Sequence, residues 1–435
     1  GLPVARTASA RSGVPVRHVG CPPGEPSLAY GANHAGSVRA RPLGKGECMK
    51  GSFRKFLAAV AVFGLIAGAC SSGDAGDGGS GGGTEEKGSI WVLLPDSASS
   101  DRWEKDDRRY FKAAFEEAGL VEGTDFTIVN AEGDAATQQS QAEQAIADGA
   151  SVIVLTSLDT GSGATIIDQA KEAGVQVVEY DRFNTGGSGG AAYVSFDNVQ
   201  VGATMATILE PAIDALGLEK PRIVMLNGGE EDNNAFLFKS GYQATVDARV
   251  AAGDWELVGD QFTPGWDNAT GQTIMEQLIV DADNKVDAVF AANDGLANSA
   301  ANALEAAGIT GAPISGQDAT AAGIQNILLG RQTMTVYKPI AAEAGVAAAV
   351  ALALRDGLTA DQAVTSYEFS VIGIDAASGQ PAEAGAAGSV LYIALVPIGV
   401  TADNILDTVI ADGFRTIEEI CTGDVAATQF CQDNA

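Results

Sequence analysis

Short apolar runs rich in β-branched residues alternate along the chain with alanine-rich segments of helical period. Runs of the first kind are typical of buried strands, and segments of the second kind are typical of amphipathic helices. Because the two patterns follow one another so regularly, they predict parallel sheets covered by helices on both faces. We therefore expect an α/β protein.

The pattern begins near Ile90 and restarts near Val199. A single sheet rarely exceeds about ten strands, so we expect two similar domains rather than one large sheet. The expected strands are Ile90–Leu94, Phe126–Asn130, Ser151–Thr156, Val175–Tyr180, Tyr193–Phe196, Arg222–Leu226, Leu257–Gln261, Ala288–Ala292, Thr333–Tyr337 and Val390–Val396. The expected helices are Trp103–Ala118, Thr137–Ala147, Ala164–Ala173, Val199–Leu216, Ala235–Val250, Ala269–Val280, Leu296–Ala306, Ile340–Arg355 and, as the last one, Thr401–Ala411, with a loop over Ala376–Gly388.

The stretch from Ile314 to Pro339 shows best what the strand ends could hold. A β-like run ends on Asp318, a helical segment follows, and a second β-like run ends on Lys338. Two parallel strands joined by a helix would bring this acid and this base to one edge of a sheet. Open α/β sheets bind their ligands at that edge, beyond the carboxyl ends of the strands.

Other expected strands also end in polar clusters. Capping of the following helix is an alternative explanation for Asp197, Asn268 and Asp294. Capping does not require cations or tryptophans. Donors and acceptors placed around indole faces suit a neutral sugar, whose hydroxyls both donate and accept while its C–H face stacks on an aromatic ring. The clusters contain Asp96, Asp101, Arg102, Trp103, Asp181, Arg182, Asp197, Asn198, Asp232, Asn233, Asn234, Trp266, Asp267, Asn268, Asn293, Asp294, Gln317, Asp318 and Lys338.

The charge of the chain narrows the choice of partners. The formal net charge is −30, and the first 69 residues hold nine of the 26 basic residues but only two of the 56 acidic ones. The rest therefore carries 17 basic and 54 acidic residues, a net charge of −37. Such a surface repels phosphate backbones, so we expect no nucleic-acid partner. Both histidines also lie in the first 69 residues, which leaves the remainder without a histidine as general base or metal ligand.

The N-terminal part has the pattern of an export signal. The basic segment MKGSFRK starting at Met49 precedes an apolar run from Phe56 to Cys70, too short to span a bilayer comfortably. Small residues precede Cys70 and a Gly/Ser-rich segment follows it, which resembles a bacterial lipoprotein signal with lipidation at Cys70. A plain secretory signal is the alternative. We expect residues 1–48 to be a mis-called upstream extension, residues 49–69 the signal peptide, and residues 70–89 a linker.

Two cysteines remain near the C-terminus, Cys421 and Cys431. In an oxidising compartment they could close a small loop, and two free thiols are the alternative. Without a histidine or a second cysteine pair we expect no zinc. No cofactor is expected either.

Two short motifs resemble the functional loops of other protein classes, but only in part. DTGSG, from Asp159 to Gly163, resembles an aspartic-protease loop, but that chemistry needs two carboxylates that share a proton and there is no second DTG. DADNKVD, from Asp281 to Asp287, resembles the start of a calcium loop but lacks its glycine and its bidentate glutamate. We expect neither a protease nor a calcium site.

Several motifs together resemble the D-xylose-binding proteins of bacterial ABC importers. They span nearly all of the chain after the signal, from about Ile90 to Phe414. The motifs are DRWEKD (Asp101–Asp106), YDR (Tyr180–Arg182), SFDN (Ser195–Asn198), DNNAFLF (Asp232–Phe238), VGDQFTPGW (Val258–Trp266), AND (Ala292–Asp294), ISGQDA (Ile314–Ala319) and QTMTVYKPI (Gln332–Ile340).

The resemblance implies a type I periplasmic-binding-protein fold, in which two Rossmann-like lobes joined by three crossover segments close on a sugar. It divides the chain into an N-terminal lobe of residues 90–197 plus 340–394 and a C-terminal lobe of residues 198–339 plus 395–435. Neighbours in DNN cannot all point inward, so Asp232 and Asn233, together with Asp294, are further candidates only. The implied hydrogen-bonding residues are Arg102, Asp181, Arg182, Asn234, Asn293, Asp318 and Lys338, and the implied stacking walls are Trp103 and Trp266.

The leading hypothesis is a monomeric, non-enzymatic receptor that is anchored outside the cytoplasm through Cys70 and delivers D-xylose or a related sugar to an ABC permease. A sensor that feeds a signalling partner remains open. A transcription regulator would need a DNA-binding segment where the chain has a signal and a linker. A secreted glycosidase would need a pair of catalytic carboxylates. The acidic residues at the strand ends show no obvious pairing of that kind beyond the sugar-binding pattern.

Overall fold

The computed structural model describes residues 87–364, 370–379, 381–383 and 385–434. All of them fall within one compact unit that starts at Gly78 and ends at Ala435. The expected upstream extension, the signal peptide and Cys70 lie outside the described residues, as does the expected linker up to residue 86. The described residues form an α/β structure with parallel sheets, so the predicted fold class is confirmed.

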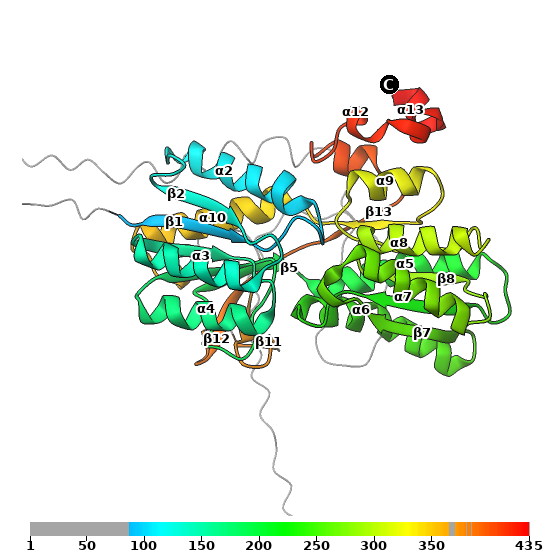
Figure 1. Ribbon diagram of the computed structural model, residues 1–435, viewed down its shortest axis with the longest axis horizontal. Helices are drawn as coiled ribbons and strands as arrows, with labels where there is room; N and C mark the ends of the chain where they lie inside the picture. The colour runs from blue at the N-terminus through cyan, green and yellow to red at the C-terminus, as the bar shows by residue number, and fades with distance from the viewer. Residues whose placement is uncertain (1–86, 365–369, 380, 384, 435) are drawn as a thin grey trace, which may run out of the picture. The chain divides into compact units, whose positions relative to one another are not determined.

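The first lobe is built on an eight-stranded sheet among the described residues, in the order β11-β10-β12-β5-β4-β3-β1-β2 (Figure 1). The strands from β12 to β2 pair in parallel, whereas β10 and β11 add an antiparallel edge. The bounds are β1 (Ser89–Leu94), β2 (Phe126–Asn130), β3 (Ala150–Leu155), β4 (Gln176–Tyr180), β5 (Ala192–Phe196), β10 (Ser370–Asp375), β11 (Pro381–Ala382) and β12 (Ser389–Leu395).

Both faces of this sheet are buried, as expected for a parallel sheet between helices. Ile90 and Val92 of β1 pack in the same apolar cluster as α2 (Arg108–Glu117) and α10 (Ile340–Arg355). Trp91 and Leu93 point to the other face, where α3 (Ala135–Ala147) and α4 (Thr160–Glu172) cover them. The alternation follows from the two-residue period of a strand, and Figure 1 shows the two helix pairs on opposite sides.

The second lobe has a smaller parallel sheet of three strands among the described residues, β6 (Arg222–Asn227), β7 (Glu256–Phe262) and β8 (Ala288–Ala291). Isolated parallel bridges continue it from Val289 to Ile314 and from Gln317 to Val336 in β9 (Thr335–Tyr337). Its helices are α5 (Asn198–Asp214), α6 (Asn233–Ala252), α7 (Asn268–Asp281), α8 (Asp294–Ala306) and α9 (Ala321–Leu328).

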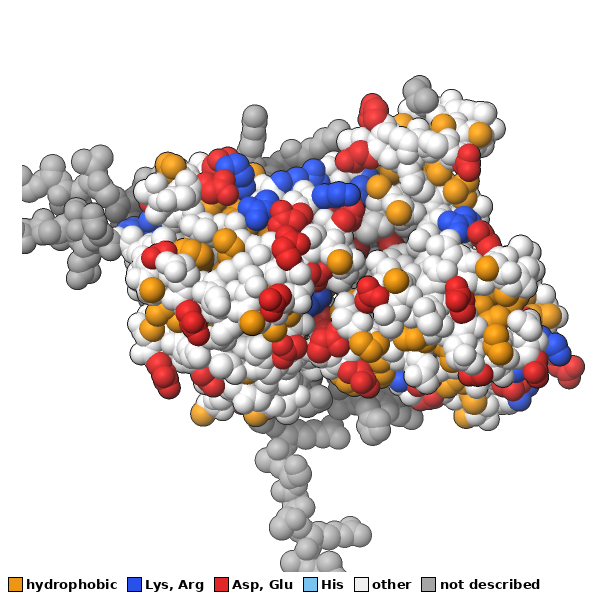
Figure 2. All heavy atoms as spheres, in the orientation of Figure 1, with side chains coloured by type: hydrophobic (Ala, Val, Ile, Leu, Met, Phe, Trp, Pro, Cys, Tyr) orange, Lys and Arg blue, Asp and Glu red, His pale blue; other side chains and the backbone are white. Residues whose placement is uncertain are grey.

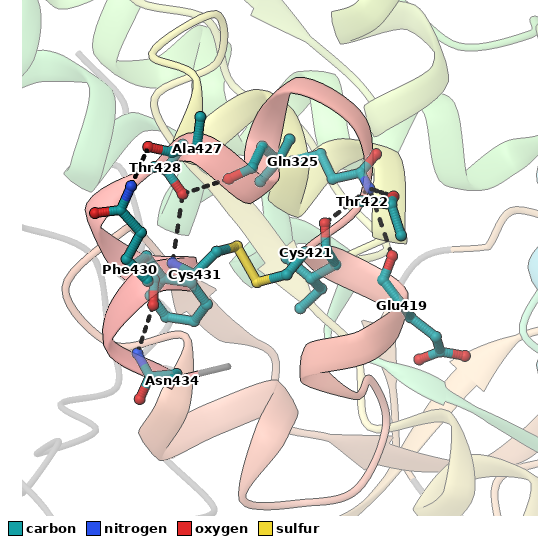
Figure 3. Close-up of a disulfide and its surroundings, with 12 residues drawn as sticks. Gln325, Glu419, Cys421, Thr422, Ala427, Thr428, Phe430, Cys431 and Asn434 are labelled. Atoms are coloured by element: carbon teal, nitrogen blue, oxygen red, sulfur yellow. Dashed lines mark hydrogen bonds between the residues drawn. A yellow bond between two sulfur atoms is a disulfide. The ribbon is translucent and has the colours of Figure 1, made fainter.

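The C-terminal tail consists of short elements that pack on α9, and a disulfide closes a loop within it. After β13 (Ile398–Val400), which pairs with β9, the chain forms η4 (Leu406–Ile410), α12 (Ile417–Ile420), η5 (Gly423–Ala427) and α13 (Gln429–Asn434). Cys421 and Cys431 are joined by a disulfide (Figure 3). Gln325 of α9 donates from Nε2 to the carbonyl of Ile420 at 2.9 Å and to Oγ1 of Thr422 at 2.9 Å, which fastens this loop to the second lobe.

The expected strand from Ile314 to Asp318 does not form as a regular element. Only isolated bridges join this segment to its neighbours. Asp318 and Ala319 adopt positive φ angles of 93° and 47°, which turn the backbone out of the extended region at the end of this segment. The chain therefore leaves the sheet edge with the Asp318 side chain already at its end.

Other local expectations also need correction. Thr401–Ala411 is not a regular α-helix and not the last helix, because it contains the π-helix η4 and α12 and α13 follow it. The helix expected from Trp103 starts as the π-helix η2 (Trp103–Asp107) before α2. The expected loop Ala376–Gly388 contains β11, and β10 was not expected at all. The strand–helix alternation of the sequence does not reveal antiparallel partners such as β10 and β12.

Candidate functional site

A cavity of about 30 Å³ lies where the strand ends of the two lobes meet. Thirteen residues line it, and all nine implied contact residues are among them. Of the three further candidates, Asp232 lines the cavity, whereas Asn233 and Asp294 do not. The lining residues are Ser99, Ser100, Arg102, Trp103, Asp181, Arg182, Asp232, Asn234, Phe238, Trp266, Asn293, Asp318 and Lys338.

Asp181 stands at the centre of the polar network, directly after β4. Its φ angle is 61°, an unusual backbone conformation for a residue other than glycine. Three donors hold its carbonyl oxygen: the hydroxyl of Tyr193 at 2.9 Å, Oγ of Ser195 at 2.8 Å and Nδ2 of Asn234 at 2.8 Å. These bonds stabilise the strained backbone, and strain of this kind is concentrated at functional sites.

Arg102 joins the Asp181 carboxylate to a second layer of buried acids. Its Nη1 donates to Oδ2 of Asp181 at 2.8 Å, and its Nε and Nη2 form a bidentate pair with Asp107 at 2.9 and 2.8 Å. Nη2 also lies 3.1 Å from Glu343 of α10. The guanidinium stacks over the Trp103 ring at 4.2 Å. Arg102 therefore fixes Asp181 and Trp103 in place as well as lining the cavity.

Lys338 brings the second cation to Asp181. Its Nζ lies 3.1 Å from Oδ2 of Asp181 and 3.5 Å from Oδ1 of Asp318. Burial by itself favours the neutral amine, but the carboxylates of Asp181 and Asp318 outweigh it and raise the pKa of Lys338. The ammonium group also lies 5.9 Å from the centre of the Phe196 ring and 6.0 Å from the centre of the Phe238 ring. Lys338 thus stays charged although it is buried, because two carboxylates face it.

Arg182 and Asp232 connect the two lobes across the cavity. Nε of Arg182 lies 3.1 Å from Oδ2 of Asp232. The Nη1 group donates to the carbonyl of Ser157 at 3.0 Å and to that of Leu158 at 3.5 Å. Asp232 is also the N-cap of α6, because its Oδ1 accepts from the backbone N–H of Asn234 at 2.9 Å. Asp232 therefore caps α6 and pairs with Arg182 at the same time.

The two asparagines that line the cavity differ in which side-chain atoms remain available for hydrogen bonds. Asn234 donates to the carbonyl of Asp181, and its Oδ1 accepts from Nδ2 of Asn198 at 3.0 Å. Asn293 caps α8 by accepting from the N–H of Leu296 at 2.8 Å. No hydrogen bond joins its Nδ2 to another described residue. Asn293 is therefore a ready donor in the cavity, while Asn234 mainly holds the backbone of Asp181.

Three residues that line the cavity have buried polar atoms without partners among the described residues. The indole nitrogens of Trp103 and Trp266 and Oδ1 of Asp318 make no hydrogen bond with any described residue. That Oδ1 lies at ion-pair distance from Lys338 without accepting a hydrogen bond from it. Trp266 has a φ of 53°, and its ring packs so closely on Gly228 that a Cβ there would come within 2.1 Å of it.

The capping alternatives have mixed outcomes. Asp197 caps α5, so helix capping, the alternative explanation for this residue, is confirmed. Asn268 and Asp294 are not caps, because the preceding residues Asp267 and Asn293 cap α7 and α8. Each helix therefore begins one residue earlier than that interpretation assumed.

Asp294 is a buried structural carboxylate behind the cavity. It accepts from Nε2 of Gln332 at 2.8 Å and from the N–H of Thr320 at 2.8 Å. Burial raises the pKa of Asp294 to about 7, against the opposing effect of the bond from Gln332. Its role is to fasten the segment before α9.

Sequence reasoning missed three lining residues, Ser99, Ser100 and Phe238. Ser100 donates to Oδ2 of Asp318 at 3.3 Å and so contacts the other lobe. Small polar residues in a serine-rich loop carry no distinctive signal, and a phenylalanine in a helix is usually core. Phe238 ends the DNNAFLF motif, and this was the one sequence feature that could have marked it as a cavity residue.

Two supporting residues were also missed, Glu343 and Arg415. Glu343 is a fully buried acid in an otherwise apolar part of α10, a pattern that could have indicated a buried cation nearby. Arg415 of the tail donates from Nη2 to Asp106 at 3.0 Å and from Nε to the carbonyl of Ala319 at 3.0 Å. It therefore connects η2 with the turn that carries Asp318.

The balance of charges favours a neutral ligand. Arg102, Arg182 and Lys338 each have a carboxylate partner inside the protein. On the face drawn in Figure 2, acidic side chains are spread widely, whereas Lys and Arg side chains gather mainly along the upper middle. The part of the chain that the structure describes contains no cluster of acids, cysteines or histidines suited to a metal ion. None of its helices is both long and apolar enough to cross a membrane.

The Asp181 cluster generates a prediction about pH. Burial opposes ionisation of Asp181, but the charges of Lys338, Arg102 and Arg182 outweigh it and hold its pKa below the ordinary value of 3.8. The stability that Asp181 contributes is thus fully present above pH 3.8 and is lost as the pH falls from there through the folded-state pKa. Burial raises the pKa of Glu343 and of Asp107. The contribution of these two carboxyl groups to the free energy of unfolding therefore decreases, rather than increases, as the pH rises.

We therefore expect Asp181→Asn to lower the free energy of unfolding by about 3 kcal/mol at neutral pH, because two buried cations lose their shared partner. Below pH 3.8 the difference from the wild type should shrink. Urea denaturation at a series of pH values measures this. A difference that stays constant down to acid pH would contradict the assignment of an ionised Asp181.

Comparison with known proteins agrees with this geometry. A family model described as a periplasmic binding protein domain matches residues 91–359. The D-xylose-binding periplasmic protein of Escherichia coli (strain K12) is 34% identical over 326 residues, which cover 75% of this chain and 90% of that protein. The D-xylose-binding periplasmic protein of Haemophilus influenzae is 35% identical over 331 residues, with 75% and 91% covered.

A solved structure is also similar to most of the chain. The carbohydrate transporter solute binding protein from Chloroflexus aurantiacus, in complex with D-glucose, is 25% identical with a TM-score of 0.66, covering 76% of this chain and 97% of that one. The family consists of binding proteins, in agreement with the expectation that the chain is not an enzyme. The predicted resemblance is confirmed: the chain belongs to the periplasmic binding protein family.

Proposed function

We propose that the chain is an extracytoplasmic substrate-binding protein of an ABC importer, and that it binds one monosaccharide, D-xylose before others, in the cavity between its lobes. The observation that carries this proposal is that one cavity is lined both by polar atoms with unused hydrogen-bonding capacity and by two buried indoles. Nδ2 of Asn293 and the remaining N–H of Lys338 can donate to sugar hydroxyls, and Oδ1 of Asp318 can accept from one. The rings of Trp103 and Trp266 can cover the C–H faces.

The internal charge pairing explains why the ligand is neutral. A free cation would attract sugar acids or phosphates, but each cation of the cavity already faces a carboxylate. Fixed charge pairs still offer strong donors and acceptors, because hydrogen bonds to charged groups are stronger than those between neutral ones. The site can therefore select a polyhydroxyl compound without a net electrostatic field.

Closure of the two lobes would couple binding to delivery. The ion pair between Arg182 and Asp232 and the bond between Ser100 and Asp318 join groups that follow strands of different lobes. A sugar that contacts both lobes stabilises the closed state relative to the open one, and a permease can recognise that state. The same closure would serve the alternative, a sensor that feeds a signalling partner.

D-Xylose leads because two relatives at 34% and 35% identity have that ligand in their names. A related pentose or hexose is the alternative, since the relative of known structure holds D-glucose. We also propose anchoring through a lipid on Cys70, on the strength of the signal pattern around it. The lobe division at residues 197/198, 339/340 and 394/395 and the monomeric state belong to the same proposal.

Isothermal titration calorimetry with D-xylose, D-glucose, D-ribose and D-glucuronate tests the ligand class. We expect at least one neutral aldose to bind with a one-to-one stoichiometry, D-xylose most tightly, and D-glucuronate to bind much more weakly because Asp181 and Asp318 would face its carboxylate. The absence of heat with every neutral aldose would rule out the proposal.

A second expectation concerns the stacking wall. Trp266→Ala should weaken aldose binding by about 2 kcal/mol, or roughly thirtyfold, because a buried aromatic anchor is lost. Phe236→Ala is the matched control, since Phe236 is 45% exposed on the same lobe and does not line the cavity. Calorimetry on both variants, with thermal melts to verify folding, measures this. Unchanged affinity in the Trp266 variant would mean that the indole belongs only to the core.

A further inference from the structure

We propose that the sugar cavity continues past Arg182 and Trp266 into a second subsite, which accepts the second ring of a neutral disaccharide or the aglycone of a glycoside. This inference rests on the proposed function and extends the substrate class from free monosaccharides to short glycosides. It starts from a second cavity that shares two residues with the first. That cavity is lined by Asp96, Gly133, Ala135, Leu158, Asp159, Arg182, Glu231, Gly265 and Trp266.

The second cavity is the roomier of the two. Its volume is about 320 Å³, compared with about 30 Å³ for the first. Its walls come from both lobes: from the loops that follow β1, β2, β3 and β4 and from those that follow β6 and β7. It therefore lies in the same cleft as the first cavity and would close with it.

The two shared residues have unused binding capacity. Trp266 is 5% exposed, and its indole N–H has no partner among the described residues. Arg182 uses Nε toward Asp232 and Nη1 toward the carbonyls of Ser157 and Leu158. No hydrogen bond joins its Nη2 to a described residue. A donor and an aromatic ring at the boundary can hold a glycosidic linkage that passes between the cavities.

The remaining walls suit hydroxyls rather than anions. Asp96 is 6% exposed and is fixed by the N–H groups of Ala98 and Ser99 at 2.8 and 2.6 Å. Oε1 of Glu231 accepts from the N–H of Gly265 at 2.9 Å, and its Oε2 accepts from no described residue. Carboxylates held in this way are preorganised acceptors for hydroxyl groups. Because they outnumber the single arginine, a sugar phosphate or a sugar acid would be repelled.

A contact between the lobes limits the length of the ligand. The backbone N–H of Thr160 donates to the carbonyl of Glu231 at 2.9 Å, and its Oγ1 donates to the same oxygen at 3.1 Å. Thr160 follows Asp159 and Glu231 precedes Asp232, so this contact closes the cleft beside the second cavity. One additional ring can fit, whereas a longer chain would have to break the contact.

Calorimetry of the full-length protein tests the inference with D-xylose, methyl β-D-xylopyranoside, and xylobiose with its two positional isomers. We expect D-xylose and at least one xylobiose to bind. Ala135→Trp fills only the second cavity and should weaken that xylobiose about tenfold or more while changing D-xylose affinity less than about twofold. Ala136→Trp is the matched control, because Ala136 is the next, exposed residue of α3 and lines neither cavity; it should change neither affinity.

The failures are distinguishable from one another. If no neutral monosaccharide binds, the proposed function itself is wrong and this inference falls with it. If D-xylose binds but no xylobiose does, whether or not the methyl xyloside binds, the second cavity is only a water-filled entrance and the inference is overturned. An equal loss of both ligands in Ala135→Trp, or no loss of either, would also overturn it. Thermal melts of both tryptophan variants exclude misfolding as the cause.

Discussion

The carboxylate of Asp181, shared between the cations of Arg102 and Lys338, is the interaction on which the rest of the site depends. Burying three charged groups is costly unless each is paired and hydrogen-bonded. The structure meets this demand with further layers, since Asp107 and Glu343 stand behind Arg102 and Asp318 stands beside Lys338. The elements that carry these residues, β4, η2, α10 and the end of β9, are thereby fixed relative to one another.

The same network places the binding groups at the meeting point of both lobes. Lys338 lies just before α10, which covers the first sheet, and just after β9, which belongs with the second lobe. A residue that contacts both Asp181 and Asp318 from this position couples the occupation of the cavity to the relation between the lobes. Arg415 adds a second connection of this kind, between Asp106 and the carbonyl next to Asp318. In the proposed function, the same charged groups would therefore serve both sugar binding and lobe closure.

Sequence patterns predicted the sheet elements and the polar strand ends well because both follow from local rules. A buried strand followed by a helix places its last polar residues at the ligand edge, so Asp181, Asn293 and Lys338 could be found without a structure. Glu343 and Arg415 could not, because their roles depend on helix and tail packing across long sequence separations. The turn at Asp318 was also missed, since a positive φ at an aspartate leaves no mark in a hydrophobic pattern. Capping and ligand contact were treated as competing explanations, although Asn293 shows that one side chain can do the first with its oxygen and keep its nitrogen for the second.

A crystal structure of the protein with D-xylose would show whether the cavity around Asp181 is the sugar site. We expect one sugar ring between the indoles of Trp103 and Trp266, with hydroxyls within hydrogen-bond distance of Nδ2 of Asn293, Nζ of Lys338 and Oδ1 of Asp318. The pairs of Asp181 with Arg102 and Lys338 should stay intact. A sugar bound elsewhere, or one that replaces Asp181 as the partner of these cations, would contradict this expectation.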